Sequence, residues 1–278
     1  MGGSSKGGGR RAVQTAGGGL APTTDEEKKM LDGSVVSENK IENGGVNESN
    51  RVVLSNGEQG IHKPGSGEQG WLAQASGGPM AMREVAAYRV DRELGFGTVP
   101  TTVQRTSNGK DGSFQRWVDN ANPGRYYMSR GAIKPNATQL KRMKALDHVI
   151  GNLDRHGNNW LVAGKKPVAI DNGSSFAKTV RAPYGLRGWG FNRDDMRNIG
   201  LSGRSKLSKK DLASIQSLVG KPGDPFTKYA TKIQRVMGPE YSGEGKITSQ
   251  SVKAMILRGR EITGSDGRFD SWATGLYG

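Results

Sequence analysis

The sequence predicts an α+β fold in two lobes, a small strand-rich lobe with one helix followed by a mostly helical lobe. Short β-type runs separated by turn residues fill the first part of the chain, together with a single amphipathic helix. Helical periodicity dominates the rest and is interrupted by one small hairpin. Two lobes leave a cleft between them, so a functional site is expected there.

In the first lobe, which we place at residues 43–118, the turn Ser55-Asn56-Gly57 joins two strands into a hairpin. Apolar residues then recur every three or four positions from Pro79 to Leu94, which predicts a helix closed by Gly95. Two further strands, 99–103 and 114–118, flank the turn at Ser107-Asn108-Gly109. The preceding residues 1–42 are poor in large apolar side chains, so we expect a flexible Gly/Ser-rich tail.

The second lobe is placed at residues 119–262, with a C-terminal tail at 263–278. Its first helix ends at Ile150 and is capped near Asn136 or Thr138. A hairpin follows, with its turn at Gly164-Lys165-Lys166-Pro167. Three more amphipathic segments complete the lobe; they contain Leu212, Ile215 and Leu218, then Phe226, Tyr229, Ile233 and Val236, then Val252, Met255 and Ile256.

Composition narrows the range of functions. The 278 residues include 41 Lys or Arg and 26 Asp or Glu, a formal net charge of +15, which favours anionic partners such as ATP, lipid headgroups or nucleic acid. There is no cysteine, which excludes disulfides, thiolate zinc sites and cysteine nucleophiles. No apolar run approaches the roughly 18–20 residues of a membrane-spanning helix. We therefore expect a soluble protein of the cytoplasm, of its own cell or of a host, with peripheral membrane contact left open.

The densest polar cluster runs from Gly151 to Trp160 and leads into the central hairpin, which ends at Asp171. Asp154, then Asn159 five positions later, and Asp171 in an Asp-x-Gly segment follow the order that phosphoryl transfer needs. One carboxylate orients the attacking hydroxyl, while an amide oxygen and a second carboxylate hold Mg²⁺ on the phosphates. The hairpin is expected to return Asp171 to Asn159.

Two upstream residues strengthen this hypothesis. Lys63 ends an apolar strand, from which a cation can reach the phosphates of a nucleotide. Glu84 lies on the helix that follows and can pair with Lys63. Either residue alone is more typical of a solvated surface, but the two in this order favour a kinase-type site.

At this point the sequence resembles the catalytic domain of phosphatidylinositol 3-/4-kinases, and within them the type II 4-kinases and their small bacterial or phage relatives. The resembling segments are collinear over residues 44–176; they are 43–49, Gly60-Ile61-His62-Lys63-Pro64, 83–91, 99–103, 112–115, 152–159 and 169–176. The resemblance implies a protein-kinase-like fold that uses ATP and Mg²⁺.

The same resemblance implies roles for single residues. Lys63 would bind the ATP phosphates with Glu84 as its partner, Asp154 would be the catalytic aspartate, and Asn159 and Asp171 would bind the metal. The loop over the phosphates would be 44–49, with Gly45, Asn47 and Ser49 as its nucleotide contacts. His156 is either a proton carrier or a packing residue.

One departure from the family concerns the membrane. Type II 4-kinases carry a Cys-rich palmitoylated insertion between the lysine and the helix, where this chain has Gly, Gln, Ala and Ser. Anchoring by that route is therefore absent. The acceptor hydroxyl stays open between a phosphoinositide, a protein side chain and a small alcohol.

Other hypotheses remain beside the kinase. A kinase-fold binding or structural protein, such as a phage or effector component, would keep the cleft with little turnover. Nucleic-acid binding through the basic C-terminal half lacks a recognised motif. Gly65-Ser66-Gly67-Glu68-Gln69-Gly70 matches a dinucleotide-binding G-x-G-x-x-G, but Pro64 interrupts the strand before it.

Overall fold

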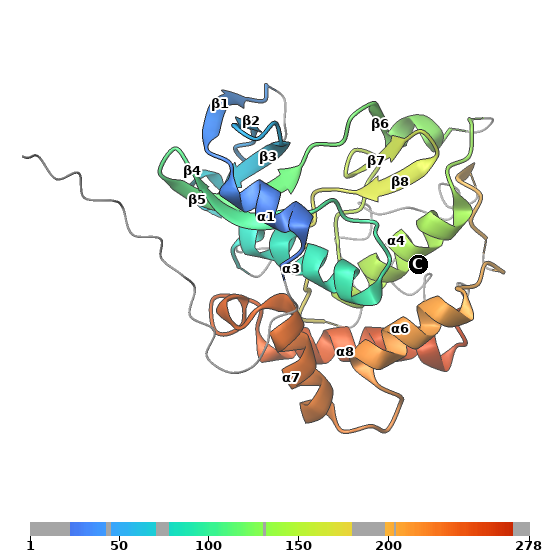
Figure 1. Cartoon of the computed structure of the whole chain (residues 1–278). Helices are drawn as coiled ribbons and strands as arrows, with labels where there is room; N and C mark the ends of the chain where they lie inside the picture. The colour runs from blue at the N-terminus through green and yellow to red at the C-terminus, as the bar shows by residue number, and fades with distance from the viewer. Residues whose placement is uncertain are drawn as a thin grey trace, which may run out of the picture.

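A computed structural model describes residues 23–42, 46–70, 78–129, 132–179, 198–202 and 204–268. It confirms the predicted two-lobed α+β fold (Figure 1). The first lobe is a five-stranded antiparallel sheet in the order β1-β2-β3-β5-β4. Its strands are β1 (Val35–Lys40), β2 (Asn50–Leu54), β3 (Gln59–Pro64), β4 (Thr102–Ser107) and β5 (Lys110–Arg116).

The predicted hairpin is β2 and β3, with Val52 opposite Gly60. The later pair of strands turns at the predicted position, yet β4 begins three residues later than predicted and β5 begins four residues earlier. The late start of β4 has a physical cause, because the backbone N–H groups of Thr98 and Val99 donate to the carboxylate of Asp91, at 2.9 and 3.1 Å. Those donors are consequently not available to a neighbouring strand.

The N-terminal prediction needs correction, because part of residues 1–42 is ordered. Residues 25–32 form helix α1 (Asp25–Asp32), and β1 pairs with β2 at the sheet edge. Thr24 and Glu27 form a capping box that starts α1. Met30 is fully buried with a small cluster under the sheet, which comprises Val52, Leu54, Val103 and Phe114. Two buried side chains, Glu27 and Met30, a cap and the pairing of β1 with β2 thus order a segment for which average composition predicted disorder.

The second lobe has the predicted helices and hairpin. Helix α4 (Ala137–Ile150) is capped by the Asn136 side chain and ends at Gly151, whose φ of 62° favours glycine. A three-stranded sheet and three more helices make up the rest of this lobe; they are β6 (Ala121–Pro123), which precedes α4, β7 (Trp160–Ala163), β8 (Lys166–Ala169), α6 (Lys209–Val219), α7 (Phe226–Met237) and α8 (Ser249–Gly264). Short 3-10 turns η1 (Gly65–Gly67), η2 (Gly124–Tyr127) and η3 (Pro239–Tyr241) complete the described elements.

Helix α3 (Met80–Leu94) joins the two lobes. Figure 1 shows it between the five-stranded sheet and helices α6, α7 and α8. Its apolar residues Val85, Val90 and Leu94 are buried in the large core that the helical lobe forms. The helix that carries Glu84 is therefore fixed by the second lobe while it faces the sheet of the first.

Among the described residues, no helix combines the length and the apolar character needed to cross a bilayer.

The ordered α1 generates a stability prediction. Glu27 is buried; its carboxylate accepts from Thr24 N and binds Arg92 Nη1 at 2.7 and 2.8 Å, which docks α1 onto α3. Glu27→Ala should lower the free energy of unfolding by about 1–2 kcal/mol, since it removes half of a capping box and a partly buried ion pair. Urea denaturation measures this. Lys28→Ala, which breaks an exposed pair with Asp25, is the control and should stay within about 0.5 kcal/mol of the parent. Equal losses in both variants would contradict the docking role.

Candidate active site

Lys63 is the penultimate residue of β3. His62 points into the sheet core and is fully buried, so alternation along the strand turns Lys63 to the opposite face. Its Nζ lies 2.7 Å from Glu84 Oε1 and 3.0 Å from Asp171 Oδ1. One ammonium group thus joins β3, α3 and the segment after β8; of these two contacts, the sequence predicted the one with Glu84.

Burial and mutual contact set the pKa values of Lys63 and Asp171. Burial acts to lower the pKa of Lys63, but the carboxylates of Asp171 and Glu84 outweigh it and raise that pKa above its ordinary value. The Lys63 ammonium, in turn, lowers the pKa of Asp171. Both groups are therefore charged near neutral pH, and the pair is an ion pair rather than a shared neutral hydrogen bond.

Glu84 has two partners, one for each oxygen. Its side chain is buried, Oε1 accepts from Lys63, and Oε2 accepts from the backbone N–H of Asn172 at 2.9 Å. The adjacent Asp171 has a φ of 55°, a left-handed conformation that non-glycine residues seldom adopt. The contact with Glu84 thus helps to hold a strained segment that presents the Asp171 carboxylate to Lys63.

Asp154 belongs to the loop between α4 and β7. Its backbone N–H donates to Asn152 Oδ1 at 2.9 Å, and Asn159 Nδ2 donates to its carbonyl at 2.8 Å and to its Oδ2 at 3.1 Å. Burial raises the pKa of Asp154 to about 6, the Asp171 carboxylate adds to this, and His156 and Arg155 oppose it. A carboxylate whose pKa is raised by burial and a neighbouring charge suits general base catalysis.

His156 lies beside this carboxylate. Its Nε2 is 3.7 Å from Asp154 Oδ1, and its Nδ1 accepts from the backbone N–H of Asn158 at 3.2 Å. Both interpretations of His156, proton carrier and packing residue, are compatible with this position.

Arg155 is the site residue that sequence reasoning missed. Its side chain is fully buried, and its guanidinium holds Asp147 through both carboxylate oxygens at 3.0–3.2 Å. It also donates to the carbonyls of Asn159 and Ile170 and to Asn172 Oδ1. Arg155 therefore cross-links the Asp154 loop to the segment that presents Asp171, yet its place in a polar stretch gave no signal of burial.

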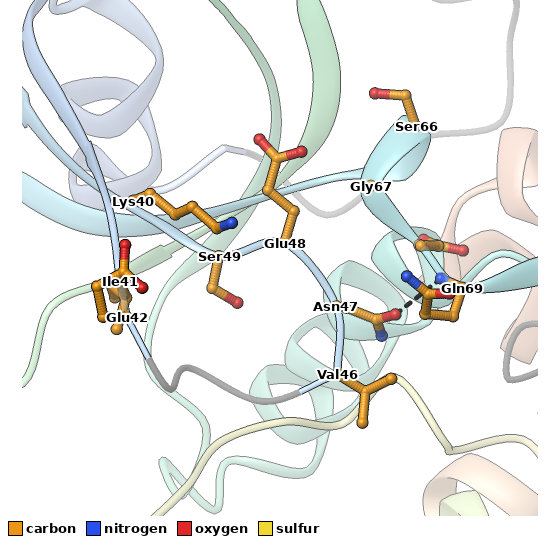
Figure 2. Close-up of a pocket in the computed structure, with 11 residues that line it drawn as sticks. Lys40, Ile41, Glu42, Val46, Asn47, Glu48, Ser49, Ser66, Gly67 and Gln69 are labelled. Carbon is orange, nitrogen blue, oxygen red and sulfur yellow. Dashed lines mark hydrogen bonds between the residues drawn. The ribbon is translucent and has the colours of Figure 1, made fainter.

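The predicted phosphate loop follows β1. Gly45 lies outside the described residues, while Asn47 and Ser49 line a cavity of about 510 Å³ between this loop and residues 66–69 (Figure 2). Lys63, Asp154 and Asp171 do not line it. Asn47 Oδ1 accepts from the backbone N–H of Gln69 at 2.9 Å, so its side chain is engaged within the first lobe.

A divalent cation would need oxygen ligands from the side chains of this site. The described residues contain no group of three or more His, Cys, Asp or Glu side chains placed to hold a metal. Asp154 Oδ1 is buried and has no hydrogen-bond partner among them, and Asn159 commits its Nδ2 to Asp154, which leaves its Oδ1 as an acceptor. Asn159 Oδ1 and the Asp171 carboxylate are oxygen ligands of the kind that Mg²⁺ takes, since this ion usually binds one or two carboxylates and completes its shell with phosphates and water.

One comparison with known protein families gives a match over part of the chain. The family model described as phosphatidylinositol 3- and 4-kinase matches residues 81–187, which include Glu84, Asp154, Asn159 and Asp171. A comparison with curated proteins found no match.

Solved structures show the same fold. A crystal structure of the Golgi casein kinase with Mn/ADP bound has a TM-score of 0.52 at 15% identity, over 89% of this chain and 75% of that one. A second structure of that kinase has a TM-score of 0.51 at 14% identity, over 86% and 74%. The Helicobacter pylori proinflammatory kinase CtkA is a weaker likeness, with a TM-score of 0.43 at 13% identity over 88% and 97%. The fold is protein-kinase-like, and together with the family-model match it supports a kinase-type phosphotransferase.

Arg155 generates a stability prediction. Arg155→Met should lower the free energy of unfolding by roughly 3–5 kcal/mol, because it leaves Asp147 charged and buried without its partner. Guanidinium denaturation measures this. Arg116→Met is the matched control, because Arg116 pairs with Glu26 and Glu58 at the surface and should cost at most about 1 kcal/mol. A loss at position 155 no larger than the control would contradict the cross-linking role.

Asp154 generates a prediction about pH. Its pKa is about 6 in the folded protein against an ordinary 3.8, so ionisation of this group destabilises the fold above pH 6 and has no effect below both values. Asp154→Asn should therefore be more stable than the parent at pH 8, by about 1–3 kcal/mol. The gain should shrink as the pH falls from 6 towards 4. Thermal unfolding at several pH values measures it, and a gain that is constant with pH would refute the raised pKa.

Proposed function

We propose that this protein is an ATP- and Mg²⁺-dependent phosphotransferase that transfers the γ-phosphoryl group to a hydroxyl of a phosphoinositide or a protein. The observation that carries the proposal is the Lys63 ammonium, paired at once with Glu84 and with Asp171, which is 108 positions away in sequence. Few functions other than phosphate binding explain a lysine held forward by a helix carboxylate beside an Asp-x-Gly segment.

Each residue has a chemical task in this proposal. Lys63 binds the α- and β-phosphates, and Glu84 keeps its ammonium in place. Asp154, with its raised pKa, accepts or orients the proton of the acceptor hydroxyl. Asn159 and Asp171 would hold Mg²⁺, which supplies neutralisation of the phosphate charge when bound. The carboxylates of Glu84 and Asp171 outnumber the Lys63 ammonium that they hold, and the Asp154 carboxyl interacts electrostatically with Asp171, so a cation improves the charge balance of the site.

The comparisons support this proposal in two ways. The matched family model is that of phosphatidylinositol kinases, which makes a phosphoinositide a reasonable acceptor, and the resemblance to type II 4-kinases and their bacterial or phage relatives points the same way. The Golgi casein kinase structure of the same fold holds Mn and ADP. A phosphorylated lipid or an acidic protein would also suit the net charge of +15.

The test is incubation with γ-labelled ATP and Mg²⁺ against phosphoinositide vesicles, generic proteins and the chain itself. Asp154→Asn should lower transfer at least about 100-fold while nucleotide binding persists. Asp171→Asn should abolish the Mg²⁺-dependent rise in melting temperature that ADP produces. Asp266→Asn, at an exposed surface pair with Lys206, is the control and should behave like the parent.

Unchanged transfer in both active-site variants would refute the residue assignments. A parent protein that binds ADP with Mg²⁺ but labels no acceptor would instead be a kinase-fold binding protein.

A further inference from the structure

Residues 65–70, Gly-Ser-Gly-Glu-Gln-Gly, form a segment that we call the strap, which is exposed except at the half-buried Gly67 and Glu68. It begins with the turn η1 and follows β3 directly. The sheet beside it is antiparallel throughout, whereas a dinucleotide-binding G-x-G-x-x-G requires a parallel strand–helix–strand unit. The motif therefore needs a different explanation in this fold.

Helix α3 begins without a cap of its own. Pro79 occupies the N-cap position and makes no side-chain hydrogen bond. The cap comes instead from the strap, because the two carboxylate oxygens of Glu68 accept from the backbone N–H groups of Met80 at 2.9 Å and Ala81 at 2.7 Å. A carboxylate at this end also complements the positive end of the helix dipole.

The capped turn lies directly before the residues of α3 that reach the site. Arg83 is buried and donates to the carbonyls of Ser175 and Phe176, and Glu84 holds Lys63 and the backbone of Asn172. A loose first turn would let this part of α3 fray. The Glu68 cap thus fixes the backbone from which Glu84 reaches Lys63.

The strap also contacts the loop between β1 and β2, the predicted phosphate loop. Glu48 N donates to Gly67 O at 3.2 Å, Gln69 N donates to Asn47 Oδ1 at 2.9 Å, and Asn47 Nδ2 lies 3.3 Å from Met80 Sδ. Figure 2 shows the Asn47 side chain directed at Gln69, with the hydrogen bond between them as a dashed line. The strap thereby links this loop to the start of α3.

The strap has little packing to hold it. None of its six residues is buried, and Glu68 lines both the 510 Å³ cavity and a second cavity of about 160 Å³. Its position depends instead on the hydrogen bonds above and on close approach at Gly67, where a Cβ would lie 2.5 Å from Glu48 Cβ.

We propose that Glu68 is a positioning residue, which caps α3 from the strap so that Glu84 stays on Lys63, and that Gly67 sets the strap against the phosphate loop. This inference rests on the proposed phosphotransferase function. Glu68 acts through Glu84 and the phosphate loop, and does not contact the reacting atoms.

The first experiment replaces the distant cap by a local one. Glu68→Ala should lower kcat for phosphotransfer about tenfold or more, because Glu84 is misplaced. It should also speed amide hydrogen exchange at Met80 and Ala81. Adding Pro79→Asp supplies an N-cap carboxylate on α3 itself and should restore both activity and exchange protection. Glu68→Gln keeps an acceptor oxygen but no charge, so its kcat and its exchange rates should lie between those of the parent and those of Glu68→Ala.

The outcomes separate the inference from the proposed function. Activity of Glu68→Ala within twofold of the parent overturns the inference. So does a double variant whose exchange protection returns while its activity does not, since Glu68 would then act in another way. If the parent itself transfers no phosphoryl group, the proposed function fails. Exchange then decides the inference: faster exchange that Pro79→Asp reverses upholds the cap, and unchanged exchange overturns it.

The second experiment tests the contact at Gly67 with a matched control in the same strap. Gly67→Ala must push Glu48 away and should raise KM for ATP several-fold. Gly65→Ala should leave KM unchanged, since a Cβ there meets only Asp111 O at 3.6 Å, an ordinary contact. Equal KM values for the two alanine variants would overturn the role of Gly67.

Discussion

The structure depends on one ammonium group that must be neutralised where it lies. Lys63 is largely withdrawn from water, and a cation in such a place is stable only beside fixed anions. Glu84 and Asp171 supply them from two different elements, the first from a helix and the second from the end of the central hairpin. The orientation of α3 and the path of the chain after β8 are both constrained by this requirement.

The two carboxylates are themselves held by the second lobe. Helix α3 buries Val85 and Val90 in the large helical core, and Asn172 is bonded by both Glu84 and Arg155. Lys63 comes instead from a sheet that has its own small core around Phe114. The ammonium therefore joins two separately packed bodies, and the Glu68 cap and the Arg105 contact to Met30 O belong to the sheet side of that junction.

Sequence reasoning singled out the residues to which the proposed function gives chemical tasks, and it missed those that hold them in place. Lys63, Glu84, Asp154, Asn159 and Asp171 stand at spacings that phosphoryl transfer imposes, so local order along the chain revealed them. Arg155 and Glu68 are explained only by partners, Asp147 and the first turn of α3, that folding brings to them. Helix α1 was not predicted, because its local signals, the capping box and Met30, lie in a Gly-rich stretch that was judged by its average composition.

This division has a physical basis. A group that must contact a substrate is constrained by that substrate, and its neighbours in sequence often contact the same substrate. Such groups therefore form a motif that can be recognised along the sequence. A group that fixes another is constrained by geometry alone, and any residue that reaches the same carbonyl or N–H from elsewhere can replace it. The strap illustrates this. The N-cap position of α3 holds Pro79, which offers no side-chain acceptor, so the cap comes from Glu68, twelve residues before Met80.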